Sequence, residues 1–222
     1  MPLPPPGTPR LAAVGADLVV LDLAADAYFC LPDVVDRDGP HGDPKLTAPG
    51  AAALRDAGYV VPFASDADAA EPVLSPPITR PTRDLRDRAR ARVRADHLLS
   101  AVLALVDLAR CGDDPTTARL LALAAPRDRV ALEPPPEAGD PSAVHDAAHV
   151  FSELLPWLPF EGACLRRSAL LVAFLRRRGL TARWVFGVRT WPFRAHCWVQ
   201  REDVCLNDDV ERLSAYTPIL AV

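Results

Sequence analysis

The distribution of prolines constrains the fold of this chain more than any other feature of its sequence. Many of its 24 prolines fall in three clusters, at residues 2–9, 72–81 and 134–141. Proline fixes φ and restrains the preceding residue to extended conformations, so a cluster does not fit inside a helix or a central strand. The middle cluster therefore predicts a linker, residues 76–84, between a small part, residues 1–75, and a larger part, residues 85–222.

Composition and charge narrow the class of protein. Half of the 222 residues are hydrophobic and 24% are charged, which is typical of a globular chain. The net charge of −4 argues against a nucleic-acid-binding protein, which normally carries a basic face. No apolar stretch reaches the length of a membrane span, and the first residues do not have the pattern of a secretory signal. We therefore expect a cytoplasmic protein that binds neither nucleic acid nor membrane.

The cysteines and histidines give no metal or disulfide pattern. The five cysteines are odd in number and have no C-x-x-C spacing, which fits neither a disulfide framework nor a zinc ribbon. Each is expected to be a small buried residue or a reactive thiol. His145 and His149 lie one helical turn apart, but no third ligand accompanies them. We expect no metal site.

The small part, residues 1–75, has the pattern of an α+β module. Residues 16–23 and 27–31 are rich in Val, Leu and aromatic residues and predict two paired strands. A short helix is expected at residues 49–57, ended by Gly58. The module has no cluster of titratable side chains, so we expect it to bind an extended peptide as an added strand. The alternative is that it only extends the packing of the larger part.

The larger part, residues 85–222, changes its periodicity near Gly179. Before this glycine, the apolar spacing predicts helices at residues 85–110, 116–124, 142–155 and 164–178. After it, the period becomes two and predicts strands at residues 181–189, 195–201 and 204–207. Helices first and strands last indicate an α+β fold, with helices packed on an antiparallel sheet.

Three residues in this part have the order of a nucleophile, a base and an orienting acid. Cys164 is expected in the first turn of a helix, where the helix dipole and the unpaired N–H groups favour a thiolate. His196 is expected on the middle strand, and Asp208 and Asp209 follow the last strand. This order on these elements suits nucleophilic catalysis by cysteine. The competing interpretation is a buried cysteine and a histidine that bonds a neighbour.

Strand pairing leaves the identity of the acid open. A two-residue turn at residues 202–203 would set His196 opposite Asp209, whereas an extra turn residue or a bulge would set it opposite Asp208. Asn207 is a third possibility, as an amide that orients the imidazole. Trp191 lies in a loop beside His196 and is expected to line the substrate groove.

Several linked motifs resemble one family. They are Cys164-Leu-Arg-Arg-Ser-Ala-Leu-Leu, Phe193-Arg-Ala-His196-Cys-Trp198-Val199 and Leu206-Asn207-Asp208. These resemble the transglutaminase-like cysteine protease of lasso-peptide biosynthesis, the leader peptidase of the B-type maturation proteins. The resemblance is close over residues 160–210 and looser over residues 85–222. It implies a papain/transglutaminase-like core with catalytic Cys164, His196 and Asp208. Cys197 departs from the usual alanine, and we expect it to be buried and to face away from His196.

The small part is similar to the leader-recognition domain of the same family. That resemblance implies a winged-helix-like module that binds the leader peptide by strand addition along residues 17–31. The residues expected at this edge are Leu18, Val20, Tyr28 and Cys30.

The resemblance implies that the protein removes the leader of a ribosomally made lasso-peptide precursor. The freed amine would then form a macrolactam on a partner cyclase of the asparagine-synthetase-like type. The sequence has no phosphate-binding loop, so we expect no intrinsic cofactor and place any ATP requirement on the cyclase. The alternatives are a peptide-binding scaffold without catalysis, and a transglutaminase or amidase that uses the same three residues.

Overall fold

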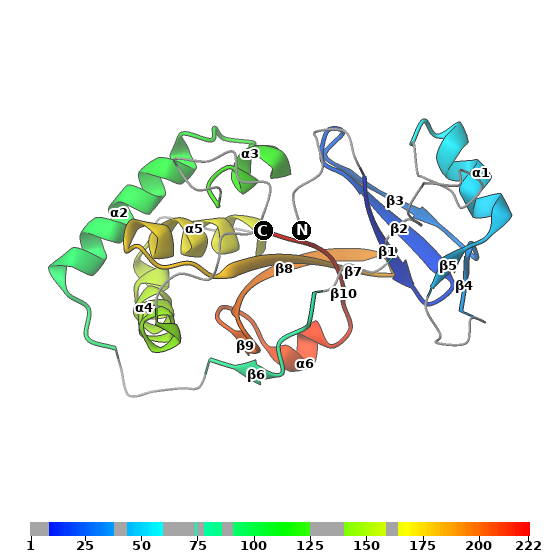
Figure 1. Cartoon of the computed structure of the whole chain (residues 1–222). Coiled ribbons are helices and arrows are strands. Elements are labelled where there is room, and N and C mark those ends of the chain that lie inside the picture. The colour runs from blue at the N-terminus through cyan, green and yellow to red at the C-terminus, as the bar shows by residue number, and fades with distance from the viewer. Residues whose placement is uncertain are drawn as a thin grey trace.

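The computed structural model of the protein describes residues 9–37, 44–59, 74, 78–85, 91–124, 140–158 and 164–222 (Figure 1). Residues 76–77 of the expected linker and most residues of the three proline clusters lie outside this range. Within it, the fold contains both sheets and helices, as the α+β expectation requires. None of the described helices is long and apolar enough to cross a membrane.

The amino-terminal residues form a three-stranded antiparallel sheet in the order β1-β2-β3. It contains β1 (Arg10–Val14), β2 (Asp17–Asp22) and β3 (Ala27–Leu31). The two expected strands are confirmed, and β1 is an addition. Gly15 takes φ +64° in the β1–β2 turn, a conformation that suits glycine. The Asp22 carboxylate accepts hydrogen bonds from the backbone N–H groups of Ala24 and Ala25 and so shapes the β2–β3 turn.

A short ribbon and one helix follow this sheet. The ribbon consists of β4 (Val35–Asp36) and β5 (Lys45–Leu46), and the helix is α1 (Ala48–Asp56). Thr47 caps α1, because its side chain accepts a hydrogen bond from the N–H of Gly50. Gly58, with φ +83°, ends the helix as expected. The described residues of this module include one helix, and its winged-helix-like character stays a prediction.

The second sheet has five strands in the order β10-β7-β8-β9-β6. The strands are β6 (Arg83–Asp84), β7 (Arg183–Arg189), β8 (Arg194–Arg201), β9 (Val204–Cys205) and β10 (Thr217–Ala221). The pairs are antiparallel except for β6 and β9, which are parallel. The sequence predicts β7, β8 and β9 but not the two edge strands. A short helix, α6 (Val210–Leu213), connects β9 to β10.

The helices of the larger part are α2 (Ala95–Ala109), α3 (Thr117–Leu121), α4 (Pro141–Leu154) and α5 (Cys164–Arg177), with a 3-10 turn, η1 (Leu155–Trp157), after α4. The helix expected from residue 85 is wrong at its start. Residues 91–94 are not helical and α2 begins at Ala95, because the preceding stretch alternates Arg with Asp and Ala and has no apolar face to bury. Gly179, with φ +71°, follows α5 as expected.

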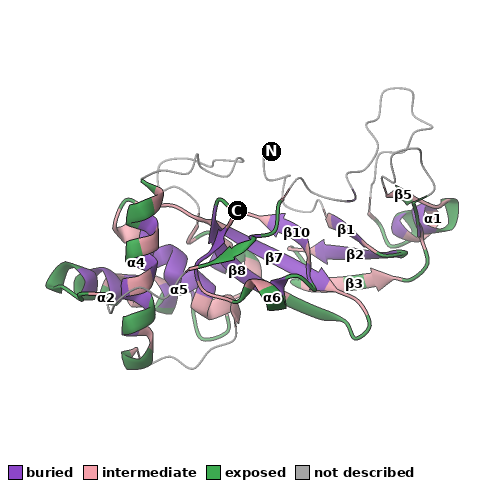
Figure 2. Ribbon diagram, turned by 90° about the horizontal axis from the view of Figure 1, so that it is seen from below, coloured by how far each residue is buried: buried purple, intermediate pink, exposed green. Residues whose placement is uncertain are grey.

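The three-stranded sheet packs on both of its faces. Val19 and Leu21 of β2 belong to the main core together with α5, α4 and β7, whereas Leu18 and Val20 point into a smaller core with Leu54 of α1. Buried residues therefore run without a break from α5 through β7 and β8 to β1 and β2 (Figure 2). This packing fixes the amino-terminal sheet against the sheet that contains His196. Residue boundaries between two domains stay a prediction.

Candidate active site

Cys164 is the first residue of α5 and lies half-buried where this helix meets β8. A thiol at the start of a 14-residue helix experiences the positive end of the helix dipole, and this position favours the thiolate. The helix packs on the sheet through an unbroken run of buried residues, from Ser168 to Leu175. The position of the thiol is therefore fixed by the main core.

His196 and Asp208 form a short hydrogen bond. The imidazole Nε2 lies 2.6 Å from Asp208 Oδ2, and the two side chains are only 11% and 4% exposed. The imidazole also lies beside the ring of Tyr216, with centroids 5.3 Å apart. The ring is therefore held on two sides, and a carboxylate bonded to one nitrogen sets which tautomer the neutral histidine adopts.

The structure brings Asp208, and not Asp209, to His196. The expected two-residue turn is present, since Arg201 pairs with Val204. However, the ladder ends at Cys205, and Asn207 then uses its side-chain oxygen to accept a hydrogen bond from the N–H of Val199 at 2.8 Å. This change moves the next residue, Asp208, toward the histidine.

Asp209 and Asn207 have other roles than orienting the imidazole. The Asp209 side chain caps α6, because it accepts a hydrogen bond from the N–H of Glu211 at 2.8 Å. Asn207 bonds the backbone of β8, as described above.

Asp208 is surrounded by groups that stabilise its negative charge. Its Oδ1 accepts a hydrogen bond from the N–H of Asp209 at 2.9 Å, and the guanidinium groups of Arg212 and Arg167 lie 3.5 Å and 3.7 Å from its two oxygens. Burial alone would raise the pKa of this carboxyl, but the hydrogen bond from His196 and that from the Asp209 N–H outweigh it, and the pKa is lowered. The carboxylate therefore remains charged beside the imidazole.

The thiol and the imidazole are arranged as an ion pair. A hydrogen bond from the Cys197 thiol and another from His196 lower the pKa of Cys164 to about 4, against the opposing effect of burial. The hydrogen bonds with Asp208 and Cys164 raise the pKa of His196 to about 9. Between these values Cys164 is a thiolate and His196 an imidazolium. A thiolate attacks acyl carbons, and an adjacent imidazolium can protonate a leaving amine.

Cys197 is buried beneath this pair. As expected it is small and buried, and it belongs to the main core with α5. Its thiol nevertheless donates a hydrogen bond to Cys164, and this bond raises its own pKa far above that of an ordinary thiol. Cys197 is therefore an unreactive donor that stabilises the Cys164 thiolate.

Sequence reasoning missed the bonding partners of Ser168. This fully buried serine lies one helical turn after Cys164, and its hydroxyl donates to the Cys197 carbonyl oxygen at 3.4 Å. The same hydroxyl accepts a hydrogen bond at 2.9 Å from the Asn207 side chain, next to Asp208. One hydroxyl thus connects the helix of the cysteine, the strand of the histidine and the loop of the aspartate. Serine inside an apolar helix is the only sequence signal for it.

The residues expected at the peptide-binding edge have different environments. Leu18 and Val20 lie on β2, which pairs with a strand on each side, and their side chains are buried. Tyr28 and Cys30 lie on β3, which has no second neighbouring strand among the described residues. β3 is therefore an edge strand of this sheet, and β1 is the other edge strand. The binding roles of these four residues stay a prediction.

The loop between β7 and β8 connects the amino-terminal sheet to the active site. Trp191 is 73% exposed, and its indole N–H donates to Asp17 Oδ2 at 2.8 Å. Phe193 lies against Tyr28 of β3, with ring centroids 5.9 Å apart. Phe193, His196 and Tyr216 in turn line an open hollow of about 710 Å³. The hollow is on the imidazole side of the site and has room for a peptide segment.

The site has the geometry for acyl transfer by a thiolate. Among the described residues, no group of three or more His, Cys, Asp or Glu side chains is arranged to hold a metal ion. Comparison with protein families finds that the model described as "Transglutaminase-like superfamily" matches residues 57–221, which include Cys164, His196 and Asp208. Comparisons with curated proteins and with solved structures find no match.

Proposed function

Because this chain belongs to the transglutaminase-like superfamily, whose chemistry is of the cysteine-peptidase or acyltransferase type, we propose that it is a cysteine peptidase that removes the leader from a lasso-peptide precursor. The observation that supports it most is the hydrogen-bonded series Cys164, His196 and Asp208, with a lowered pKa at the thiol and a raised one at the imidazole. The motifs around these three residues, which resemble those of the lasso-peptide leader peptidases, support the choice of substrate.

In the first step of the proposed reaction, the Cys164 thiolate attacks the carbonyl carbon of the bond between leader and core. A C–S bond forms, the C–N bond breaks, and the His196 imidazolium gives its proton to the leaving amine. The leader is then held as a thioester on Cys164. The backbone N–H of Cys164, at the start of α5, supplies one donor to the oxyanion.

In the second step, neutral His196 accepts a proton from water while the oxygen of that water attacks the thioester carbon. The C–S bond breaks, the leader leaves as a carboxylic acid, and the thiolate–imidazolium pair is restored. Asp208 keeps the imidazole in the required tautomer through both steps. Hydrolysis of a peptide bond needs no ATP, so an ATP requirement belongs to the partner cyclase that forms the macrolactam from the freed amine.

The β3 edge is the proposed docking site of the leader. An extended peptide can pair with β3 through main-chain hydrogen bonds. Tyr28 of this strand contacts Phe193, which lines the hollow beside His196. A leader bound along β3 therefore ends close to the thiolate.

Mass spectrometry of the precursor peptide tests this proposal. A lasso-peptide precursor with its leader would be incubated with a lasso-peptide cyclase and ATP, together with wild-type protein, Cys164→Ala or Cys111→Ala. Cys111 is a buried cysteine outside the site and serves as the matched control. We expect one cut at the leader–core bond with wild type and Cys111→Ala, and a loss of at least about 1000-fold in rate with Cys164→Ala.

The same experiment separates the alternatives. An intact precursor in all samples, with the leader still bound, would favour a scaffold without catalysis. A mass increase from an added primary amine, in place of the water product, would identify a transglutaminase, because the same thioester is then intercepted by an amine.

A further inference from the structure

The hollow beside the imidazole contains arginines without an acidic partner. Its lining includes Arg189, Arg194 and Arg212 together with one acid, Glu211. Arg212 is paired, since its guanidinium lies 3.5 Å from Asp208 Oδ1. Within the part of the chain that the structure describes, no ion pair or side-chain hydrogen bond involves Arg189 or Arg194. These two side chains therefore bring positive charge into the hollow without an internal acid to bind it.

Strand pairing places the two unpaired arginines next to each other. Arg189, the last residue of β7, pairs directly with Arg194, the first residue of β8. Directly paired residues have their side chains on the same face of a sheet, and like charges at such a pair are destabilising. His196 is two residues further along β8, so its imidazole shares this face. An anion bound between the two guanidinium groups would remove their repulsion and would lie close to the imidazole.

Tyr216 supports the Arg189 side chain in this position. The guanidinium lies over the Tyr216 ring, 5.6 Å from its centroid, and the same ring lies beside the imidazole of His196. The Nε atom of Arg189 is buried and has no hydrogen-bond partner among the described residues. Contact with an aromatic ring orients a guanidinium but leaves its charge without an anion. The group is thus held at the wall of the hollow and remains available to a carboxylate.

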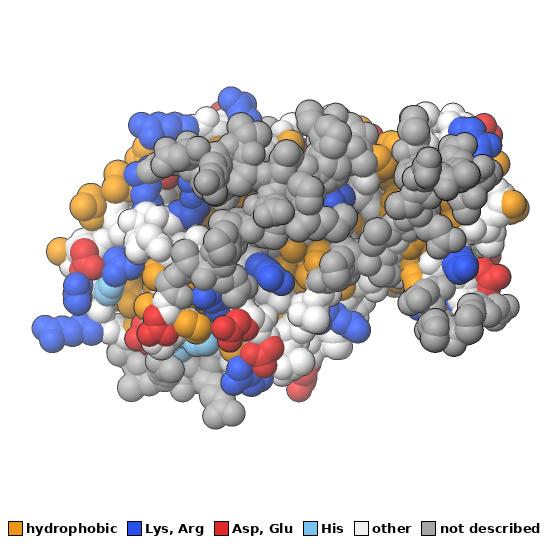
Figure 3. Space-filling model, in the orientation of Figure 1, with side chains coloured by type: hydrophobic (Ala, Val, Ile, Leu, Met, Phe, Trp, Pro, Cys, Tyr) orange, Lys and Arg blue, Asp and Glu red, His pale blue; other side chains and the backbone are white. Residues whose placement is uncertain are grey.

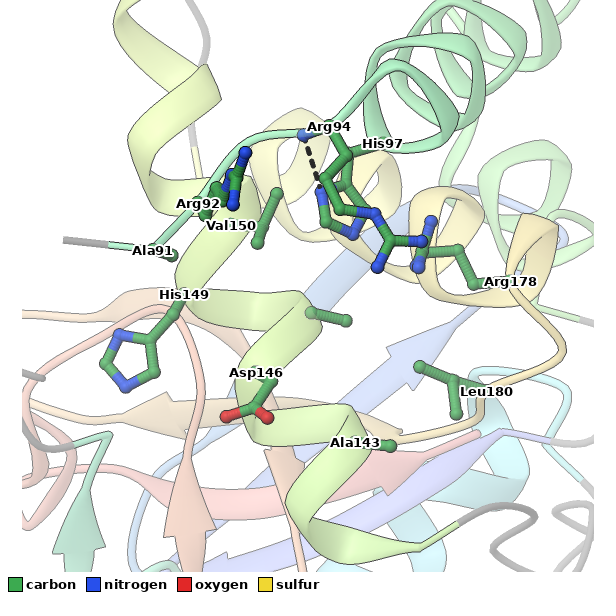
Figure 4. Close-up of a pocket in the computed structure, with 11 residues that line it drawn as sticks. Ala91, Arg92, Arg94, His97, Ala143, Asp146, His149, Val150, Arg178 and Leu180 are labelled. Atoms are coloured by element: carbon green, nitrogen blue, oxygen red, sulfur yellow. Dashed lines mark hydrogen bonds between the residues drawn. The ribbon is translucent and has the colours of Figure 1, made fainter. Parts of the chain in front are cut away.

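A larger hollow elsewhere on the molecule shows the contrast. It has a volume of about 900 Å³ and is lined by the start of α2 and one side of α4 (Figure 4). Arg94 and Arg178 line it, but Asp96 binds both guanidinium groups, at 3.0 Å and 3.2 Å. Figure 3 likewise shows acidic side chains next to basic ones in this part of the surface. These two arginines already have their anion, whereas the pair beside the imidazole has none among the described residues.

The two faces of the sheet indicate which half of a substrate reaches the hollow. Cys164 and Tyr28 pack against the main core, on the face of the sheet that α5 covers, whereas Tyr216 packs with Trp198 on the opposite face. In the proposed reaction the leader forms the thioester on Cys164, and the leaving amine takes its proton from His196. The residues after the cut therefore pass the imidazole and enter the hollow.

We infer that the hollow binds the carboxylate of an acidic substrate residue that lies within about three residues after the cut, an inference that rests on the proposed peptidase function. An extended chain advances about 3.3 Å per residue, so two or three residues reach from the imidazole to the arginine pair. Guanidinium groups bind a carboxylate through charge-assisted hydrogen bonds. Including the His196 imidazolium and the Asp208 carboxylate, four positive groups face two negative ones at this site. An acidic residue is therefore favoured there over a neutral or basic one.

Precursor peptides that differ at one residue test this inference with the full chain. Each has the same leader, an amidated carboxyl terminus and glutamine at the first three core positions; glutamate or lysine then replaces one glutamine at a time. Mass spectrometry of leader release, with the cyclase and ATP present, gives kcat/KM. We expect glutamate at one of these positions to raise kcat/KM at least about tenfold over glutamine, and lysine to lower it. Equal kcat/KM for all peptides would overturn the inference.

Variants of Arg194 assign the preference to this hollow. Arg194 is exposed and is a better site for substitution than Arg189, which contacts the tyrosine beside the imidazole. Arg194→Gln should reduce the preference for glutamate to less than about threefold, and Arg194→Glu should reverse it in favour of lysine. Arg110→Gln, at the exposed arginine that ends α2, is the matched control and should keep the preference of wild type. An undiminished preference in Arg194→Gln would overturn the inference.

Binding to Cys164→Ala separates this inference from the proposed activity. This variant forms no thioester, so fluorescence anisotropy with labelled precursors measures binding alone. We expect the glutamate peptide to bind about fivefold more tightly than the glutamine peptide, and Arg194→Gln in the same background to remove the difference. If no peptide is cleaved but this difference is present, the peptidase function fails and the hollow still binds an acid. If the peptides are cleaved without any preference in rate or binding, the inference fails alone.

Discussion

The ring of Tyr28 lies against the ring of Phe193, with centroids 5.9 Å apart, and so joins the amino-terminal sheet to the loop that precedes His196. Burial raises the pKa of the Tyr28 hydroxyl, and the negative charges of Asp26 and Cys164 add to this effect. Tyr28 is therefore close enough to the thiolate to experience its charge. A peptide paired along β3 would touch the same ring.

Replacing Tyr28 should weaken cleavage of a leader-containing substrate. We expect Tyr28→Ala to lower kcat/KM for the precursor about tenfold. An aromatic pair stabilises a structure by about 0.5–1.5 kcal/mol beyond the effect of its buried area, and the loop before His196 also loses its contact with Tyr28. Phe29→Ala is the matched control, because Phe29 points to the other face of the strand, where it contacts Tyr59. Equal losses in both variants would argue against a specific link between Tyr28 and the active site.

The rate of leader removal should have a bell-shaped dependence on pH. Activity requires the Cys164 thiolate and the His196 imidazolium, so it should rise as pH passes about 4 and fall as pH passes about 9. Alkylation by iodoacetamide, followed by mass spectrometry, should label Cys164 even at mildly acidic pH and leave buried Cys205 unlabelled. Labelling of Cys164 only at alkaline pH would contradict the ion pair.

Asp208→Asn should shift the alkaline limb of this profile. The hydrogen bond that His196 donates to Asp208 is the largest contribution to the raised pKa of His196, so its loss lets the imidazolium deprotonate at lower pH. We expect the descending limb to move toward neutrality and the maximal rate to fall by at least about 100-fold. Asp209→Asn is the control and should retain the wild-type profile; if it reproduces the shift, the assignment of the acid is wrong.

Ser168→Ala should disturb the site although Ser168 is fully buried. The substitution leaves the half-buried Asn207 amide without its acceptor, which costs about 1–3 kcal/mol of unfolding free energy. Because Ser168 connects three elements of the site, we also expect kcat to fall while KM stays nearly constant. Ser152→Ala, which removes a hydroxyl bonded within α4, is the control. Thermal unfolding and steady-state kinetics measure the two effects.

Local patterns in the sequence predict the elements that hold the candidate nucleophile and base. The change of period at Gly179 identifies α5, β7 and β8, and with them the places of Cys164 and His196. The edge strands β1 and β10 were not predicted, because both are short apolar segments without strong alternation. Strand β6 was not predicted because its two residues are held only by pairing with β9.

The remaining features of the site depend on contacts between distant parts of the chain. The approach of Asp208 depends on where the β8–β9 ladder ends, which Asn207 determines through its bond to Val199. The position of Tyr28 beside Phe193 depends on packing of the amino-terminal sheet against the main core. No periodicity or spacing within a single sequence encodes these contacts.

Cys197→Ala tests how the thiolate is stabilised. Alanine is the usual residue at this position in the family that the motifs resemble, so the protein should fold and cleave the precursor. The Cys197 thiol is the largest contribution to the lowered pKa of Cys164, and its loss should raise that pKa and move the acidic limb of the pH–rate profile upward. Alkylation of Cys164 should then slow at acidic pH but remain fast near neutrality, where His196 still holds the thiolate. An unchanged acidic limb would mean that His196 and the helix dipole are enough to keep Cys164 ionised at acidic pH. An inactive but folded variant would mean that Cys197 takes part in the reaction itself.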